Sequence, residues 1–150
     1  MTPSVSSRPS LAPTKFGRSV DIKGDTIIVG DGIHPACGGA YIFQRNSHLW
    51  TQQAQLTPTD CSSAEAPAGL RKIGFGFSVS LDEDGRTAVV GDSSDATNGV
   101  DSGAAYVYSL SNETWSLQTK LVAGDGAGKF AGASILILFY LFSNYLLSSK

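Results

Sequence analysis

The sequence predicts an all-β repeat protein, because one pattern of short apolar segments occurs twice within its 150 residues. Residues 16–22 (FGRSVDI) return as residues 75–81 (FGFSVSL), and residues 26–31 (TIIVGD) return as residues 87–92 (TAVVGD). Residues 38–43 (GGAYIF) return as residues 103–108 (GAAYVY), and Trp50 returns as Trp115. The copies differ in length only between these blocks, so the blocks are structural elements and the gaps are loops. A period of this size is typical of solenoids and propellers.

Each repeat contains four segments with the composition of β-strands. In the second repeat they are residues 78–81, 87–91, 104–108 and 115–121, rich in Val, Tyr and Trp and separated by Gly, Asp, Asn and Ser. Asp84-Gly85 is a hairpin dipeptide, because glycine reaches positive φ at no steric cost, and Gly24-Asp25 stands at the same place in the first repeat. Residues 45–47 and 111–113 are polar connectors. We therefore expect each repeat to form a four-stranded antiparallel meander.

The second segment of each repeat is apolar on consecutive residues, at 27–29 and at 88–90. Such a strand buries both of its faces, which a lone meander in water cannot do. Sheets that stack face to face as the blades of a β-propeller can do it. Because a closed propeller takes about four to eight blades, two repeats form only part of one. We expect residues 27–29 and 88–90 to supply apolar outer faces that further blades cover, and we expect the chain to associate.

These blocks resemble the FG-GAP repeat, over residues 16–130. The second copy carries Phe-Gly-x-Ser-Val at 75–79, Val-Val-Gly at 89–91 and Ser-Gly-Ala-Ala-Tyr at 102–106, while the first copy is looser. Asp31 and Asp92 stand where the family usually has Ala-Pro. The resemblance implies blades like those of the integrin α-subunit propeller, a non-catalytic role in binding or cell adhesion, and an extracellular or cell-surface location. Its partners would be proteins or further propeller blades.

The resemblance also raises the question of Ca²⁺, which family propellers often bind in the hairpin between strands 1 and 2. Here that hairpin holds Asp82 and Asp84 but is short and lacks the final Asp of the usual loop. Ca²⁺ takes six to eight oxygen ligands, so a solvated charged turn is favoured over a metal site. We expect no cofactor.

The resemblance suggests a ligand-binding face at one end of the blades. In a meander, the loops between strands 2 and 3 and those between repeats lie at the same end. These loops collect a set of acidic residues: Asp31, Asp60, Asp92, Asp95, Asp101 and Asp125. In integrins the corresponding end engages ligands. Ordinary solvation of surface loops is the alternative for any single carboxylate.

The same loop arrangement bears on the two cysteines. Cys37 lies in the loop between strands 2 and 3 and Cys61 in the loop between the repeats, so a disulfide is geometrically possible and two free thiols are the alternative. Asn112-Glu113-Thr114 is an N-glycosylation sequon.

The sequence divides into five segments. Residues 1–15 are rich in Ser, Pro and Thr without an apolar run, so a disordered segment is expected and no signal peptide is seen. Repeat 1 takes residues 16–60, an inter-blade loop 61–74 and repeat 2 residues 75–130. Residues 131–150 form a hydrophobic tail or a degenerate third repeat. Residues 131–147 are uncharged and near the lower length limit of a membrane span, so a membrane anchor, a buried strand and a gene-model artefact remain open.

Two motifs typical of enzymes lack their partners. Residues 88–93 (AVVGDS) are similar to the nucleophile block of GDSL esterases, with Ser93 as the nucleophile, but no histidine follows it. Residues 123–129 (AGDGAGK) imitate a phosphate loop, with Phe130 where Ser or Thr would bind Mg²⁺. The net charge of −2 without a basic cluster gives no sign of nucleic-acid binding. We expect no catalysis, with a GDSL-like esterase or a membrane-anchored surface protein as alternatives.

Overall fold

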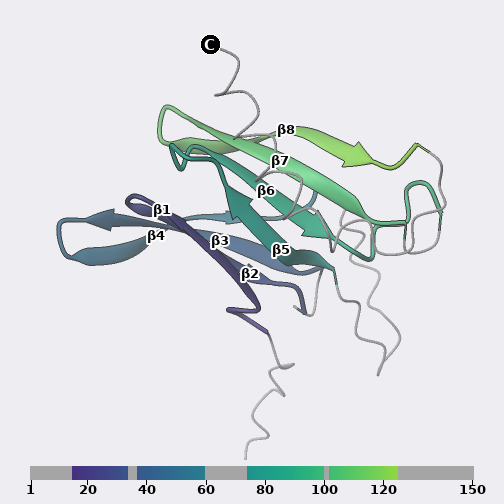
Figure 1. The fold of residues 1–150 in the computed structure, drawn as a ribbon, viewed down its shortest axis with the longest axis horizontal. Helices are drawn as coiled ribbons and strands as arrows, with labels where there is room; N and C mark the ends of the chain where they lie inside the picture. The colour runs from purple at the N-terminus through teal and green to yellow at the C-terminus, as the bar shows by residue number, and fades with distance from the viewer. Residues whose placement is uncertain (1–14, 34–36, 60–73, 100–101, 125–150) are drawn as a thin grey trace, which may run out of the picture.

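The computed structural model describes residues 15–33, 37–59, 74–99 and 102–124, which form two antiparallel sheets (Figure 1). The described residues contain no helix. The first sheet, blade 1, has the order β1-β2-β3-β4, and the second, blade 2, has the order β5-β6-β7-β8. The strands of blade 1 are β1 (Ser19–Lys23), β2 (Thr26–Asp31), β3 (Gly39–Asn46) and β4 (Leu49–Leu56). Those of blade 2 are β5 (Phe75–Leu81), β6 (Thr87–Asp92), β7 (Ala104–Ser111) and β8 (Thr114–Val122). The predicted pair of four-stranded meanders is confirmed.

The turns form for the reasons that the sequence predicts. Gly24 and Gly85 adopt φ of +55° and +63° in the hairpins β1–β2 and β5–β6. Asn112 and Glu113, at +48° and +62°, close the β7–β8 hairpin with the two consecutive left-handed residues of a tight turn. The left-handed conformation is easiest for glycine, and asparagine tolerates it better than most residues.

The two blades also share a β-bulge that the sequence pattern does not predict. The β3–β4 pairing shifts register between Ile42 and Phe43, and the β7–β8 pairing shifts between Val107 and Tyr108. These positions are equivalent in the two repeats. The extra residues are Gln53 in β4 and Gln118 in β8, which no partner residue opposes. A β-bulge changes the direction in which the side chain of the extra residue points. The bulge therefore gives Gln53 and Gln118 equivalent places in the two blades.

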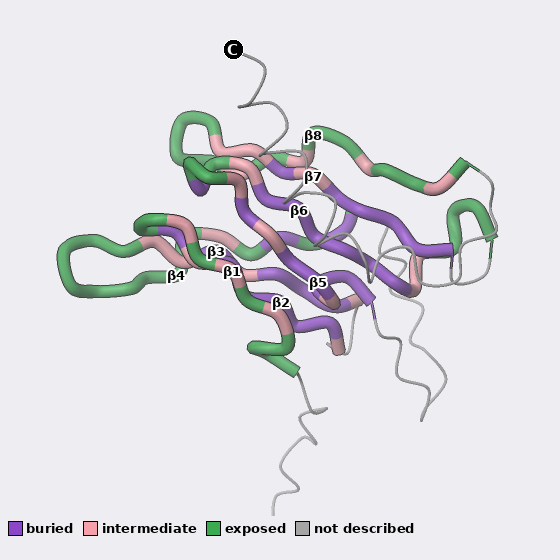
Figure 2. The backbone as a smooth tube through the Cα atoms, viewed as in Figure 1, coloured by how far each residue is buried: buried purple, intermediate pink, exposed green. Residues whose placement is uncertain are grey.

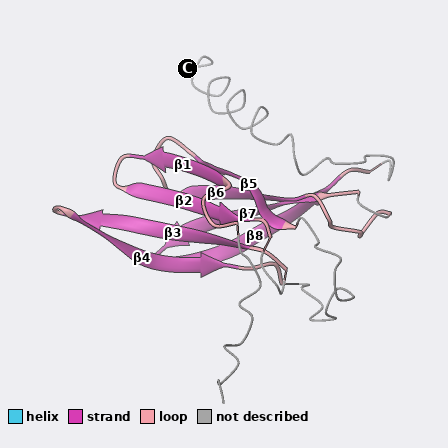
Figure 3. Ribbon diagram, turned by 90° about the horizontal axis from the view of Figure 1, so that it is seen from below, coloured by secondary structure: helices cyan, strands magenta, loops and turns pink. Residues whose placement is uncertain are grey.

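The core lies between the blades (Figure 2). Blade 1 contributes Ile28, Ala40, Ile42 and Leu56, and blade 2 contributes Phe75, Val79, Leu81, Ala88, Val90, Ala104, Tyr106 and Tyr108. The inner strands pack closely, because β5 lies against both β1 and β2, whereas β4 and β8 barely touch. Sheets that meet at their first strands and are apart at their last are arranged like adjacent propeller blades. Figure 3 shows the strands of blade 1 side by side in the order β1 to β4.

One expectation about the faces holds only in part. Ile28, Ala88 and Val90 are fully buried between the blades, whereas Ile27 and Val29 pair with Ile22 and Val20 and lie on the outer face of blade 1. On this outer face the more exposed apolar side chains belong to the innermost strand, where Val20 and Ile22 are 63% and 54% exposed. Strand alternation explains the difference: within each middle strand, neighbouring residues face opposite sides of the sheet.

Candidate functional site: the inter-blade joint and the loop end

The joint between the blades is made by backbone, and the Phe-Gly block of blade 2 is its centre. Gly74 N–H donates to the Gly32 carbonyl (2.9 Å) and Phe75 N–H donates to the Cys37 carbonyl (3.1 Å). Gly76 adopts φ +89°, and a Cβ there would lie 2.0 Å from the Gly39 carbonyl oxygen. Close backbone approach therefore requires a glycine at this position, which explains the second letter of the repeated Phe-Gly block.

Blade 1 forms the surface that receives this block, and we call this surface, formed by Ser19, Gly30 and Gly38, the socket. A Cβ on Gly30 would lie 2.2 Å from the Gly76 carbonyl oxygen, and one on Gly38 would lie 1.9 Å from that of Phe75. Ser19 Oγ donates to the Gly76 carbonyl (3.1 Å). The repeated glycines of the Val-Gly-Asp and Gly-Ala-Tyr blocks thus clear a surface on which the next Phe-Gly block sits.

Side-chain contacts also bridge the blades outside this joint. Asp21 Oδ2 of β1 accepts from Leu81 N–H (2.8 Å) and from Ser80 Oγ (3.3 Å). Trp115 Nε1 of blade 2 donates to Gln53 Oε1 of blade 1 (3.0 Å), so the bulge in β4 presents Gln53 to the next blade. Tyr108 Oη of β7 donates to the Thr57 carbonyl, just after β4 (2.8 Å).

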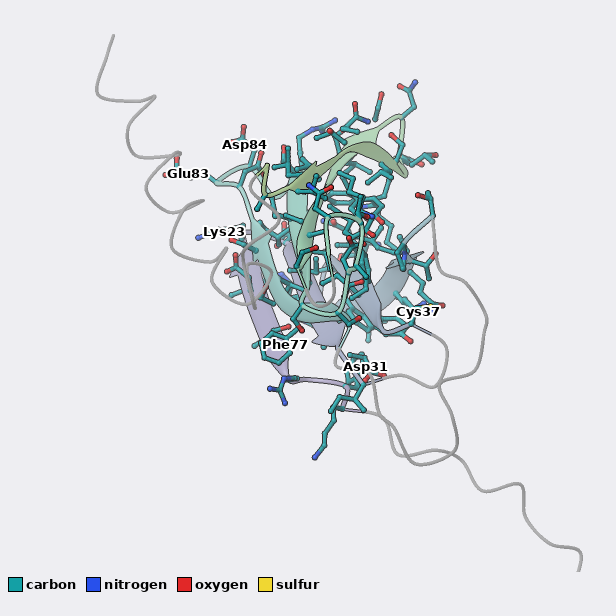
Figure 4. The ribbon with its side chains drawn as sticks, turned by 90° about the vertical axis from the view of Figure 1, so that its right-hand side faces the viewer. Lys23, Asp31, Cys37, Phe77, Glu83 and Asp84 are labelled. Carbon is teal, nitrogen blue, oxygen red and sulfur yellow. The ribbon has the colours of Figure 1, made fainter. Side chains whose placement is uncertain are left out.

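The loops between strands 2 and 3 of both blades lie at the end where the joint is formed. Figure 4 places Asp31 and Cys37 at this end and Glu83, Asp84 and Lys23 at the opposite end. We call the end that carries Asp31 and Cys37 the loop end. It comprises residues 31–33, 37–38 and 93–103. Residues 100 and 101 of this range lie outside the described residues, as do Asp60, Asp101 and Asp125 of the predicted acidic set.

The acidic residues of the loop end that the structure describes are engaged internally. Asp31 is 2% exposed and accepts from Lys15 N–H (2.7 Å). Asp92 is 7% exposed and its Oδ1 accepts from the N–H and the hydroxyl of Ser94 (both 2.9 Å). The carboxylate of Asp31 also helps to raise the pKa of Tyr41, after the larger effect of burial. These carboxylates hold the loops rather than face the solvent.

Asp95 organises the larger loop of blade 2. Its Oδ2 accepts from Tyr106 Oη (3.1 Å) and pairs with Lys120 Nζ (2.6 Å), which also donates to Thr97 Oγ1 (2.7 Å). Its backbone carbonyl accepts from Gly103 N–H (2.9 Å). Burial acts to raise the pKa of Asp95, but hydrogen bonds from Lys120 and Thr97 and the Lys120 charge together outweigh it, so the pKa is lowered.

The predicted weak metal site lies at the opposite end. Asp82 Oδ1 accepts from the N–H groups of Arg86 (2.8 Å) and Thr87 (2.9 Å), so one of its oxygens caps the hairpin. Asp84 is exposed at the turn. Within the described ranges, no three His, Cys, Asp or Glu side chains are grouped to hold a metal ion.

Cys37 is disulfide-bonded in the structure. The sequence contains one other cysteine, Cys61, which lies outside the described residues, so the Cys37–Cys61 pairing stays a prediction. The Cys37 carbonyl accepts from Phe75 N–H, which places the bonded cysteine within the inter-blade joint. Asn112 of the sequon is exposed at the tip of the β7–β8 hairpin.

The esterase alternative finds no support in the geometry. Ser93 is 6% exposed at the loop end, after β6. His48 is in the β3–β4 hairpin, which lies at the other end of the sheet by strand topology, and His34 is outside the described residues. Residues 125–129 of the phosphate-loop imitation, and the tail at 131–150, also fall outside them. No helix in the described part of the chain has the length and apolarity to cross a membrane.

A comparison with known protein families matches residues that include the inter-blade joint. The model of the FG-GAP repeat family matches residues 50–108, from the start of β4 to the middle of β7. The chain carries an FG-GAP repeat. The matched stretch includes the Phe-Gly block of blade 2 and the Val-Gly segment of β6, which are the parts that build the joint described above. A search among curated proteins gave no match.

Proposed function

We propose that this FG-GAP chain is a non-catalytic binding module whose loop end engages a protein ligand at a cell surface. The observation that carries the proposal is the convergence of both strand 2–3 loops beside the inter-blade joint. A rigid sheet that positions irregular loops is the usual way for a protein to present a recognition surface.

The loop of blade 2 supplies the best-defined part of this surface. The Asp95 network holds the loop from within, while Ala96, Thr97 and Asn98 are exposed at its tip. Asn98 Nδ2 donates to the Ala123 carbonyl (2.7 Å), which ties the tip to the segment after β8. Since the described carboxylates serve the loop architecture, the surface offered to a ligand is mainly neutral and polar.

Two features favour an extracellular location. Disulfides persist in oxidising compartments, and Cys37 is disulfide-bonded. The exposed hairpin tip presents Asn112 as a glycosylation acceptor in such a compartment. Both features agree with the extracellular proteins in which FG-GAP repeats typically occur.

Adhesion of cells to surfaces coated with the purified chain tests the proposal. Cells of the source organism should be retained above the level of an albumin coating. Ala96→Arg, at the loop tip, should abolish retention, whereas Glu83→Arg, an exposed change at the opposite end, should not. Retention at the albumin level, or equal losses in both variants, would refute the assignment. A parallel assay with p-nitrophenyl acetate should show no hydrolysis above a Ser93→Ala protein.

A further inference from the structure

The outer face of blade 1 repeats the face by which blade 2 packs on blade 1. Val79 and Leu81 of β5 are 1% and 2% exposed because blade 1 covers them. Their equivalents in β1, Val20 and Ile22, are 63% and 54% exposed. Equivalent residues are therefore core in one repeat and surface in the other, because within the described part of the chain a blade covers this side of the second repeat and not of the first.

The aromatic residues show the same relationship. Phe75 packs edge-on against Tyr106, with ring centroids 5.2 Å apart, and is fully buried. Phe16 packs in the same manner against Tyr41, at 5.4 Å, yet is 54% exposed. Within each blade the Phe side chain is held in a similar way, so blade 1 presents a preformed aromatic surface.

The backbone of the first Phe-Gly block also keeps its docking conformation. Gly17 has φ +88°, compared with +89° at Gly76. A Cβ on Gly17 would meet nothing within 4 Å, whereas one on Gly76 would strike the Gly39 carbonyl.

The tryptophans differ between the repeats in the same way. Trp50 is 38% exposed, whereas the equivalent Trp115 donates its indole N–H to Gln53 of the other blade.

On the far side of blade 2, the outer strand β8 exposes equivalents of blade 1 residues that face blade 2, whereas Val89 and Ala105, the equivalents of Ile28 and Ala40, are 3% and 4% exposed. Leu121 is 53% exposed, and its equivalent Leu56 is 3% exposed in the joint. Gln118 is exposed at the β8 bulge, as Gln53 is placed at the β4 bulge. Gly103 has φ +77°, close to the +88° of Gly38 in the socket.

We propose that the outer face of blade 1 docks onto the outer side of blade 2 in a second copy of this chain. The joint within the chain is the template: Trp50 of one copy donates to Gln118 of the other, β1 of the first copy packs on β5 and β6 of the second, and Phe43, the equivalent of Tyr108, lies beside Leu121. The proposed contact has different surfaces on the two copies, so it repeats head to tail and ends only when a ring closes. A ring of about four to eight blades would take about two to four copies of the two described blades.

Complementary variants test the direction of the contact by sedimentation velocity. The mass of the parent chain should rise with concentration. Val20→Lys should block the blade 1 face and Leu121→Lys the blade 2 side, so that each variant alone is a monomer. Mixed in equal amounts, the two variants should form a 1:1 dimer, because each retains the surface that the other has lost. Leu49→Lys, at a 71% exposed site on the β3–β4 hairpin, is the matched control and should associate like the parent.

Several results would overturn the proposal. These are a parent that stays monomeric, association that survives Val20→Lys, association that survives Leu121→Lys, or a mixture that stays monomeric. Association lost only in Val20→Lys would mean that blade 1 pairs with itself. Circular dichroism and thermal melts of each variant check the fold, and Ile22→Lys replaces Val20→Lys if that variant is unfolded.

Discussion

Gly76 stands against Gly39 across the blade joint with no room for a side chain, since a Cβ on Gly76 would lie 2.0 Å from the Gly39 carbonyl oxygen. Gly17 occupies the same place in the first repeat with nearly the same φ and with nothing within 4 Å. This pair separates two reasons for glycine. One is the left-handed backbone, which both positions share, and the other is close approach to a neighbouring blade, which only Gly76 has.

Alanine at the two positions should therefore have unequal effects. Gly17→Ala should lower the free energy of unfolding by about 1–2 kcal/mol, the cost of a left-handed conformation for an L-residue. Gly76→Ala should lose a further ~1–3 kcal/mol, because the backbone must shift to relieve the clash. Urea unfolding followed by tryptophan fluorescence measures both. Equal losses would contradict the inter-blade contact.

Asp21 should matter more than its neighbour Asp25. Asp21→Ala removes the acceptor for the Leu81 N–H between the blades, and an unpaired amide there costs about 1–3 kcal/mol. Asp25→Ala breaks an ion pair with Arg45 in which both side chains are about half exposed, worth ~0.5 kcal/mol or less. Denaturant midpoints of the two variants give the comparison. A larger loss in Asp25→Ala would argue against the bridging role of Asp21.

The lowered pKa of Asp95 predicts how stability changes in acid. A carboxyl group with a folded-state pKa below its unfolded value contributes stability that is fully present above the unfolded pKa, near ~3.9, and is lost as the pH falls through the folded pKa. Unfolding measured from neutral pH to about pH 2 should show this loss in the parent. Asp95→Asn should be less stable at neutral pH and should show a flatter acid limb. Parallel curves for the two proteins would contradict the shift.

The disulfide should stabilise the joint. We expect no iodoacetamide uptake by the unreduced chain and uptake at Cys37 and Cys61 after reduction, read by intact mass. Cys37→Ser should lower stability by about 2–4 kcal/mol, as for loops of this order of length. A Cys37→Ser/Cys61→Ser protein should lose no more than the single variant, which is the control for pairing. Uptake by the unreduced chain would show that the cysteines are not paired.

Calcium should have little effect on the chain. Asp82 caps the β5–β6 hairpin through the Arg86 and Thr87 amides, so its carboxylate is only partly available for a metal. Calorimetric titration with Ca²⁺ should give no micromolar binding. Asp82→Ala should destabilise the fold by about 1 kcal/mol, through loss of the capping bonds, equally with and without Ca²⁺. A micromolar isotherm that Asp84→Ala abolishes would overturn this expectation.

The sequence by itself determined the repeat, the strands and the turns of this protein. Each depends on local chemistry: alternating or continuous apolar residues set the strands, and Asp84-Gly85 closes its hairpin because glycine accepts positive φ. The Phe-Gly and Val-Gly motifs could likewise be recognised because each occurs once in both repeats.

Only the tertiary structure decided which copy of each residue is buried. Val20 and Val79 are the same residue in the same strand position, and their exposures of 63% and 1% differ because a second sheet covers only one of them. The same reason explains why the bulge at Gln53 serves Trp115, which belongs to the other blade. Contacts between residues distant in sequence depend on how the two blades pack together, and the local sequence pattern does not predict that packing.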